Sequence, residues 1–255
     1  MVVPQDLEIA EELRALPAFS ELSKELLAEL ASAAVQHRMH AGVTLLDQGT
    51  VGGSFVVLAR GAVKMVRTTA HASGDSVVVL DVLRAPAIVT DAAMFDGTAA
   101  SSTVITLRAS HFIFLDRRVL MKLAAIHAPL ARSLFAHLAH IVRRHVRRID
   151  EVASGAVDER VRHLLEGLAH DHGTPFGQGR FIAIPLRRRD IACMVNATTE
   201  TVSRLLARFE REGQVRSTRD GIWWRHVDAS APAELAVGAA GASAVTSAVA
   251  RKTQA

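Results

Sequence analysis

The spacing of apolar residues changes along this chain, and the change limits the folds open to it. From His40 to about Leu115 the sequence breaks into short runs rich in Val, Ile, Thr and Phe, separated by Gly or by Asp/Ser/Thr clusters. Short strands at intervals of ~8–12 residues are typical of an antiparallel barrel, sandwich or jelly roll. On both sides of this segment the apolar residues recur every three or four positions, as in helices. The expected fold class is therefore α+β, with a mostly β domain between helical segments.

Leucines at three-to-four spacing predict helical structure from residue 7 to residue 37, divided at Pro17. Ser20 is the expected N-cap of the second helix, because its hydroxyl can accept a hydrogen bond from a free backbone N–H. The first residues carry acidic side chains and no continuous apolar segment, which is unlike a signal peptide. No segment reaches the ~18 apolar residues of a membrane span. We therefore expect a cytoplasmic protein with no membrane partner.

Cysteine is represented only by Cys193. An internal disulfide is impossible, which fits a reducing compartment. An iron–sulfur cluster held only by cysteines needs about four thiolates, so this type of cluster is excluded. Cys193 itself is expected to be a small buried residue rather than a redox sensor.

A long helix without Gly or Pro is predicted from Pro129 to shortly before Gly155. Apolar positions alternate three and four apart along it, which is typical of a short coiled coil. The helix could pack only on its own domain, but it is long for one small β domain to cover. We therefore predict a dimerisation helix, with the contact made by Leu134, Leu138, Ile141 and His145.

The segment RRRDIACMVNATTETVSRLLARFEREG predicts two short helices joined by a tight turn at Asn196 and Ala197. Thr198 is the expected N-cap of the second helix, and Gly213 is the expected left-handed residue after its end. The second helix buries an apolar stripe at three-to-four spacing. Two helices joined in this way form a helix-turn-helix. Asp220-Gly221 predicts a two-residue hairpin turn, which would form a wing.

The exposed face of the second helix is polar and basic near its N-terminal end, where a recognition helix meets base edges in the major groove. Arginine can bond guanine in a bidentate manner, and glutamate can accept from the cytosine amino group. Threonine and serine hydroxyls suit bases or phosphates. The candidate DNA-binding residues are Thr198, Thr199, Glu200, Ser203, Arg204 and Arg208.

These residues carry a resemblance to a known family. TTETVSRLLARFEREGQV resembles the recognition helix of the Crp/Fnr superfamily of bacterial transcription regulators, and the flanking IPLRRRDIACMV and RSTRDGIWW extend the match. Upstream, AGVTLLDQGTVGGSFVVLARGAVKMV is similar to the β-roll signature of that family, and DAAMFDG to the segment after it. The resemblance covers roughly residues 19–228.

The resemblance implies a β-roll like that of cyclic-nucleotide-binding proteins, then a dimerisation helix and a winged helix-turn-helix. It implies that Glu200, Ser203 and Arg204 contact bases, in a spacing similar to Fnr-type readers of TTGAT half-sites. Crp-type readers usually have Arg where this chain has Thr199. A homodimer would place two recognition helices about 34 Å apart on a palindrome, and RNA polymerase would be a further partner. The implied domains are an N-terminal arm (1–18), the β-roll (19–125), the dimerisation helix (126–153), the winged helix-turn-helix (154–228) and a disordered Ala-rich tail (229–255).

The effector pocket departs from the family's pattern. Members that bind cyclic nucleotides have a Gly-Glu pair and an Arg-Ser/Thr pair, whereas this chain has Thr90-Asp91 and Ser101-Ser102 at those positions. The arginine that would neutralise the cyclic phosphate is absent, and Arg108 is the nearest substitute. A phosphate without a cationic partner loses its charge-assisted hydrogen bonds, so we do not expect cAMP to bind. The pocket could hold another polar ligand, on Thr90, Asp91, Ser101, Ser102 and Thr103.

Haem stays open as a cofactor because histidine is a common axial ligand. Most histidines of the chain are nevertheless expected to be surface residues, and His145 could instead tune a dimer through its protonation. The candidate haem ligands are His71, His111, His127, His137, His140 and His145.

The sequence supports three classes of function to different degrees. A DNA-binding transcription regulator rests on the recognition helix. The alternative is a ligand-binding module, sensing haem or a small molecule, that acts mainly through protein contacts. An enzyme ranks last, because the sequence has no Ser/His/Asp spacing, phosphate-binding Gly loop or metal-ligand cluster. His170 and His172 beside Asp171 come nearest to a metal site, and a polar helix end explains them.

Overall fold

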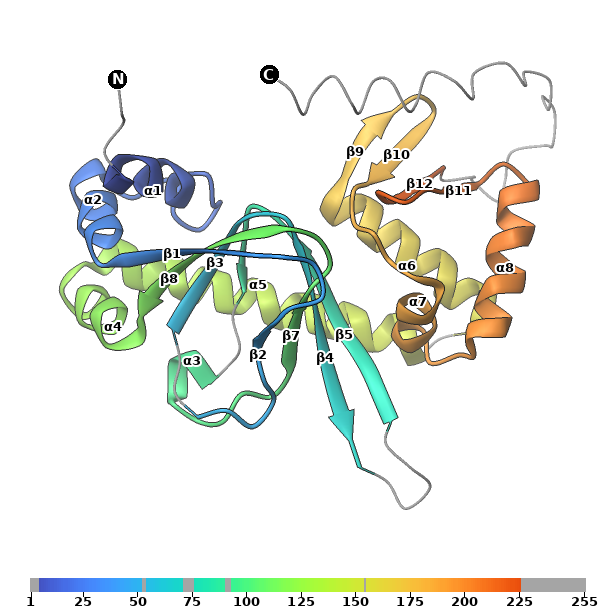
Figure 1. Cartoon of the computed structure of the whole chain (residues 1–255), viewed down its shortest axis with the longest axis horizontal. Helices are drawn as coiled ribbons and strands as arrows, with labels where there is room; N and C mark the ends of the chain where they lie inside the picture. Colours follow the sequence, from blue (N-terminus) through green and yellow to red (C-terminus); the bar gives the residue numbers. More distant parts are fainter. Residues whose placement is uncertain (1–4, 52–53, 71–75, 90–92, 154, 226–255) are drawn as a thin grey trace.

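The computed structural model describes residues 5–51, 54–70, 76–89, 93–153 and 155–225 (Figure 1). The tail predicted at 229–255 lies outside the described residues. The helices are α1 (Gln5–Arg14), α2 (Lys24–Ser32), α3 (Ala93–Asp96), α4 (Arg117–Ile126), α5 (Ala128–Ala153), α6 (Val157–His172), α7 (Arg188–Met194) and α8 (Thr199–Arg211). The strands are β1 (Ala34–Met39), β2 (Thr44–Leu46), β3 (Ser54–Arg60), β4 (Ala62–Thr69), β5 (Ser76–Arg84), β6 (Ala87–Val89), β7 (Thr103–Thr106), β8 (Ser110–Asp116), β9 (Gly173–Phe176), β10 (Gly179–Ile182), β11 (Val215–Ser217) and β12 (Ile222–Trp224).

Two four-stranded antiparallel sheets form the β domain. The first sheet has the strand order β1-β8-β3-β6 and the second β2-β7-β4-β5. Leu58 and Phe112 of the first sheet meet Val63 and Val104 of the second in one buried cluster. Successive side chains of a strand point to opposite faces, so each sheet has a second face that something else must cover. The α+β class and the β-roll predicted from the sequence are confirmed.

Helices α1, α2, α4 and the start of α5 cover the free face of the first sheet (Figure 1). Phe19, in the α1–α2 connection, stacks on Phe55 of β3 with ring centroids 5.7 Å apart. Leu130 and Leu134 of α5 are buried in the same cluster. The N-terminal arm therefore belongs to the core of the β domain.

The structure corrects three details of the N-terminal and β segments. Ser23, not Ser20, caps α2, because its hydroxyl accepts from the backbone N–H of Leu26 at 3.2 Å. Residues 34–39, expected to be partly helical, form β1, since their backbone pairs with β8 along the whole strand. The short β6 was not predicted, and it is defined by pairing with β3. The two missed strands depend on backbone pairing with strands distant in sequence.

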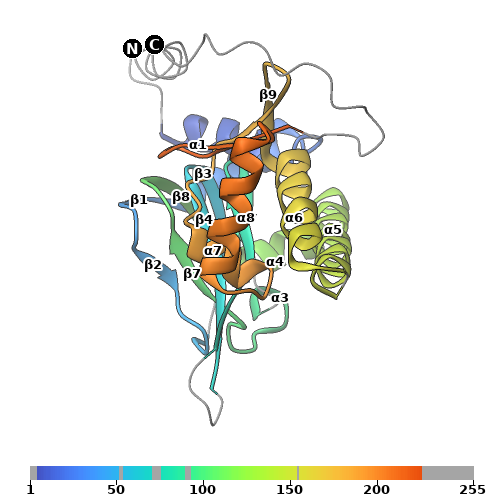
Figure 2. The same ribbon diagram turned by 90° about the vertical axis from the view of Figure 1, so that its right-hand side faces the viewer.

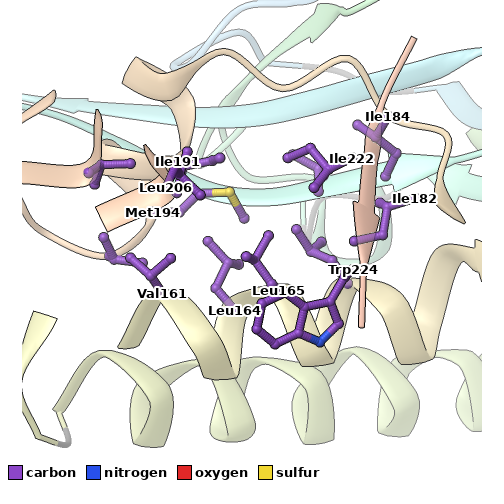
Figure 3. Packing of buried hydrophobic residues seen from close by; sticks show 14 of the residues in the cluster. Val161, Leu164, Leu165, Ile182, Ile184, Ile191, Met194, Leu206, Ile222 and Trp224 are labelled. Atoms are coloured by element: carbon purple, nitrogen blue, oxygen red, sulfur yellow. The ribbon is translucent and has the colours of Figure 1, made fainter. Parts of the chain in front are cut away.

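The C-terminal domain, comprising α6–α8 and a third sheet of order β11-β12-β10-β9, covers the free face of the second sheet. Figure 1 places it on the side of β4 and β5 away from α1, α2 and α4. Ala62, Val66, Val79 and Val82 of the second sheet join its apolar cluster. Figure 3 shows Ile191, Met194 and Leu206 gathered above α6, with Ile222 and Trp224 beside them. The two domains are thus packed through an apolar core.

Polar contacts flank this interdomain core. The Lys64 ammonium lies 2.6 Å from the Asp190 carboxylate at the start of α7, and Asp190 is only 6% exposed. Arg144 of α5 lies 2.6 Å from Asp81 of β5. Arg148 of α5 donates to the backbone carbonyl of Met194 at 2.7 Å. These contacts tie α5, the second sheet and α7 together.

Among the described residues, no single helix has the length and apolar character to cross a membrane. The bent pair Arg117–Ile126 and Ala128–Ile149, with 118° between its helices, passes by length and composition only.

Candidate nucleic-acid interface and effector region

Helices α7 and α8 form a helix-turn-helix. Asn196 occupies the left-handed region at φ 49°, which asparagine tolerates better than most residues. The backbone N–H of Ala197 donates a hydrogen bond to the carbonyl of Ala192 at 3.0 Å. The Thr198 hydroxyl accepts from the N–H of Thr201 at 3.2 Å, so Thr198 is the N-cap. The predicted turn and cap are confirmed.

The end of α8 follows the expected motif. Gly213 has φ 67°, and the N–H of Gln214 bonds the carbonyl of Phe209 at 2.8 Å while Gly213 bonds Glu210 at 3.1 Å. This pair of bonds is a Schellman motif. Val202, Leu206 and Phe209 are buried against α6 and the third sheet. The apolar stripe therefore fixes which face of α8 points outward.

The outward face carries most of the residues predicted to bind DNA. Thr199, Glu200 and Arg204 are exposed, and Ser203 is half-buried beside them. Arg204 lies 3.9 Å from Glu200, with side chains 72% and 80% exposed. An exposed pair of this kind contributes little and both side chains can reorient. Thr198 is exposed too, but its hydroxyl is engaged in the cap.

Arg208 differs from the other predicted contacts. Its guanidinium donates to the Asp158 carboxylate of α6 at 3.2 Å and lies 5.2 Å from the centroid of the Phe209 ring. The side-chain hydrogen bond from Arg208 helps hold the pKa of Asp158 below its ordinary value, against the opposing effect of desolvation. Arg208 therefore braces α8 against α6 in this structure instead of joining the outward face.

The wing has a longer loop than the sequence predicted. Ser217 pairs with Ile222, so Thr218 to Gly221 form a four-residue loop closed by Thr218 N–H to the Gly221 carbonyl at 2.9 Å. Gly221 is required for another reason than turn geometry. A Cβ there would lie 2.1 Å from the backbone oxygen of Ile182 in β10. The strands β9 and β10 complete the sheet behind the wing.

Exposed arginines lie on α7 and on the wing, two elements that contact α8, and were not among the predicted site residues. The Ser217 hydroxyl donates to Glu210 of α8 at 2.7 Å, which ties the wing to the recognition helix. Exposed guanidiniums suit phosphate contacts. These arginines are Arg188 and Arg189 at α7 and Arg216 and Arg219 on the wing. The arginine-rich runs RRR and RSTR could have predicted them from the sequence.

Helix α5 presents a different apolar face from the predicted one. Leu134 is 4% exposed and lies in the core of its own domain, so it cannot meet a partner chain. Leu138 and Ile141 are half-buried, and His145 is exposed. The outward apolar face consists of Phe135, Val142, Val146 and Ile149, with exposed fractions of 70%, 59%, 52% and 66%. Three of these residues follow a predicted one directly, a rotation of about 100° for 3.6 residues per turn.

Three of the five predicted effector residues lie in the part of the chain that the structure describes. Thr90 and Asp91 lie outside the described residues. Ser102 is fully buried and Ser101 exposed. The Thr103 hydroxyl accepts from the backbone N–H of Gln48 at 3.0 Å. Arg108 turns away from this region and contacts the carbonyl of Ala183 in the C-terminal domain at 3.5 Å.

A cyclic phosphate does not fit these residues. The sequence has no Lys or Arg between Arg84 and Arg108, and the structure directs Arg108 to another partner. Arg117 of α4 reaches α3, but its guanidinium donates to the backbone carbonyls of Met94 and Phe95 at 2.6 and 2.9 Å.

The candidate haem histidines are scattered. His111 is buried beside Glu12 at 3.5 Å, and His127 lies 3.6 Å from Glu29. His137 and His140 lie on α5, and His71 is outside the described residues. In the part of the chain that the structure describes, no three His, Cys, Asp or Glu side chains are grouped as for a metal ion.

Comparisons with known proteins match both domains. A family model for the Crp-like helix-turn-helix domain matches residues 159–229, and one for the cyclic nucleotide-binding domain matches residues 36–127. A CRP-like cAMP-activated global transcriptional regulator of Mycobacterium tuberculosis is 25% identical over 175 residues, covering 69% of this chain and 77% of the relative. A cyclic AMP receptor protein of Thermus thermophilus is 25% identical over 205 residues, covering 80% and 90%.

Solved structures share the fold. The c-di-GMP responsive global regulator CLP of Xanthomonas campestris has a TM-score of 0.64 at 14% identity, covering 80% of this chain and all of the other. FixK2 of Bradyrhizobium japonicum has a TM-score of 0.64 at 19% identity, covering 76% and 93%. At these identities the likeness concerns the fold alone.

Proposed function

The chain belongs to the Crp/Fnr-type DNA-binding transcription regulators, and from this premise we propose that it acts as a homodimer on a palindromic, TTGAT-like site. Like its curated relatives it is a regulator and not an enzyme. A cytoplasmic location and contact with RNA polymerase are parts of the same proposal.

The outward face of α8 carries the proposal. The helix is anchored by the buried side chains of Val202, Leu206 and Phe209. Its N-terminal half therefore exposes Thr199, Glu200 and Arg204. In this mode Arg204 donates two hydrogen bonds to a guanine and Glu200 accepts from a cytosine. Ser203 and Thr199 reach bases or phosphates. Arg188, Arg189, Arg216 and Arg219 would contact phosphates on both sides and fix the register without reading sequence.

Dimerisation is proposed through the outward apolar face of α5. Phe135, Val142, Val146 and Ile149 recur at intervals of seven, four and three, as in a coiled-coil seam. Apolar side chains at half or more of their full exposure gain stability when a second copy covers them. A two-fold axis along α5 would present two recognition helices to two half-sites one helical turn apart.

The effector of this regulator is proposed to differ from cAMP. The names of the relatives mention cAMP, but this chain has no cation between Arg84 and Arg108 to hold a cyclic phosphate. Haem stays open as a sensor group, and an absorption spectrum of the purified protein tests it directly.

Substituting Arg204 tests base reading. We expect Arg204→Ala to weaken binding to a TTGAT palindrome by about 1–3 kcal/mol while hardly changing binding to unrelated DNA at the same salt. Arg211→Ala is the matched control, because Arg211 is exposed on the same helix but at its C-terminal end. It should leave the ratio of specific to non-specific affinity unchanged. If Arg204→Ala also leaves this ratio unchanged, Arg204 does not read a base.

The alternative, a ligand-binding module that acts through protein contacts, makes the opposite prediction. The unmodified protein would then show no preference for any palindrome over unrelated DNA at a fixed salt concentration.

A further inference from the structure

A cavity of about 580 Å³ lies where the two domains and α5 meet. One wall is mainly apolar and comes from residues 16–18, between α1 and α2, and from the β5–β6 turn at 85–86 with its flanking residues Leu83, Ala87 and Ile88, and Arg84 lies next to this wall. The opposite wall is polar and comes from His137, His140 and Arg144 of α5 and from His172 at the end of α6. Figure 2 shows α5 and α6 side by side at this junction. Of the described effector candidates, Ser101, Ser102 and Thr103 do not line this cavity, whereas two of the candidate haem ligands, His137 and His140, do.

The size and lining suit a small molecule. Ligand cavities of about 300–1,000 Å³ are commonly found at domain interfaces, with an apolar lining and a few convergent polar groups. Here the polar groups come from both domains, because α5 and Arg84 pack with the β domain while His172 ends a helix of the C-terminal domain.

Two nitrogen atoms of the lining residues lack partners. Nε2 of His137 and Nε of Arg144 are each buried and accept or donate no hydrogen bond among the described residues. Buried polar groups in native proteins nearly always have a partner, because leaving one unsatisfied is destabilising. One terminal nitrogen of Arg144 forms an ion pair with Asp81, at a distance of 2.6 Å. The Nε–H of this guanidinium is thus a buried donor without a partner in a residue that lines the cavity.

The charges around the cavity favour an anion. Arg84 has no carboxylate partner among the described residues and contacts only the carbonyl of His172 at 3.4 Å. Asp81 is paired with Arg144 at 2.6 Å and Asp171 with Arg147 at 3.5 Å. Burial lowers the pKa of His137 to about 4 and also lowers the pKa of His140 and His172, so these imidazoles are neutral near pH 7. The surplus charge is that of Arg84.

We propose that this interdomain cavity binds a small organic anion, whose charged group is held by Arg84 and Arg144 and whose apolar body lies against residues 16–18 and the β5–β6 turn. His137 supplies a further hydrogen bond through Nε2. An occupant contacts both domains and therefore stabilises their packed arrangement. The regulatory meaning of the site rests on the proposed function, whereas binding itself does not.

The probe is 1-anilinonaphthalene-8-sulfonate, an aromatic anion whose fluorescence rises in apolar surroundings. Titration of the full chain should show one saturable site per chain. The uncharged N-phenyl-1-naphthylamine should bind at least tenfold more weakly, because it gains no charge-assisted hydrogen bond. Equal affinity for both probes, or absence of a saturable site for the anion, would overturn the proposal. The titration contains no DNA, so its failure is independent of any failure in base reading.

Variants locate the site. Arg144→Gln should weaken anion binding about tenfold or more, while Arg143→Gln, an exposed neighbour outside the lining, should not change it. Asp81→Asn separates binding from structure, because it breaks the same ion pair but leaves the Arg144 charge in place. Binding should then stay equal or become tighter. If Asp81→Asn weakens binding as much as Arg144→Gln does, Arg144 only supports the fold and the proposal is wrong.

Discussion

Arginines in similar sequence contexts make different contacts in this protein. The Arg204 side chain is exposed on α8, whereas Arg208, one turn later, donates a hydrogen bond to Asp158. Arg108, the nearest candidate for a phosphate ligand in the β domain, bonds a carbonyl of the C-terminal domain instead. The difference arises because a guanidinium can reach several partners. The residue type determines which hydrogen bonds these side chains can form, whereas their neighbours in the fold determine which of those bonds are made.

The protonation of His137 illustrates the same dependence at the residue scale. Burial, and then Arg144 and His140, lowers the pKa of His137 from 6.5 to about 4. Between these values the unfolded chain binds more protons than the folded one, so stability falls as the pH drops through this window. Between pH 7 and pH 5 the wild type should lose about 2 kcal/mol more than His137→Gln in urea unfolding. Parallel losses in both proteins would contradict the lowered pKa.

At the scale of elements, α5 shows why a periodic pattern does not define an interface. The helix has two apolar stripes, and one of them, with Leu130 and Leu134, packs into its own domain. The other stripe, with Val142 and Ile149, faces outward. The sequence predicted a dimerisation helix from its length and spacing, but the apolar stripe that the structure leaves exposed is one residue out of phase with the predicted one. Only packing on α4 and the first sheet decides which stripe remains free.

Charge on the outward stripe should separate the proposed dimer. We expect Val142→Glu combined with Ile149→Glu to give a folded monomer, because two buried like charges at a two-fold contact are costly. Sedimentation should show half the mass, with an unchanged circular dichroism spectrum.

The control for this experiment is Leu134→Glu. It places the charge in the core of the chain itself, so it should unfold the protein rather than dissociate it. A Val142→Glu, Ile149→Glu variant that sediments as the wild type does would exclude this face as the contact.

At the scale of the whole molecule, the second sheet is covered on both faces. Val63 faces the first sheet, while Ala62 and Val66 pack against the C-terminal domain. Lys64 lies on that second face and pairs with Asp190, whose carboxylate also accepts from the N–H of Arg187 at 3.0 Å. The DNA-binding domain is thus fixed to the β domain through the first helix of its helix-turn-helix.

The Lys64–Asp190 pair predicts a non-additive response. Lys64→Met should reduce the free energy of unfolding by about 3 kcal/mol, because it leaves the Asp190 charge buried without a partner. Adding Asp190→Asn should restore more than half of this loss, since the amide still accepts at the helix start and carries no charge. Urea unfolding of the two single variants and the double variant measures the coupling. Additive losses would show that the pair is not coupled.

Much of this protein follows from local sequence. The strands β3, β4, β5, β7 and β8, the turn at Asn196, the Thr198 cap and the Gly213 end of α8 were predicted and are present. Each depends on residues within a few positions, through alternation, hydroxyl capping or the conformational freedom of glycine. The outward face of α8 follows from its own apolar stripe.

Tertiary structure alone decided the rest. The strand β1, the free stripe of α5, the engagement of Arg208 and the cavity at α5 depend on segments far apart in the chain. Gly221 gives the clearest case, because its requirement comes from the backbone of Ile182 and not from its own turn. Side-chain chemistry and period are properties of a segment, but exposure and partners are properties of the packed molecule. The sequence by itself therefore determined which face α8 exposes, and only the fold decided what surrounds and restrains that face.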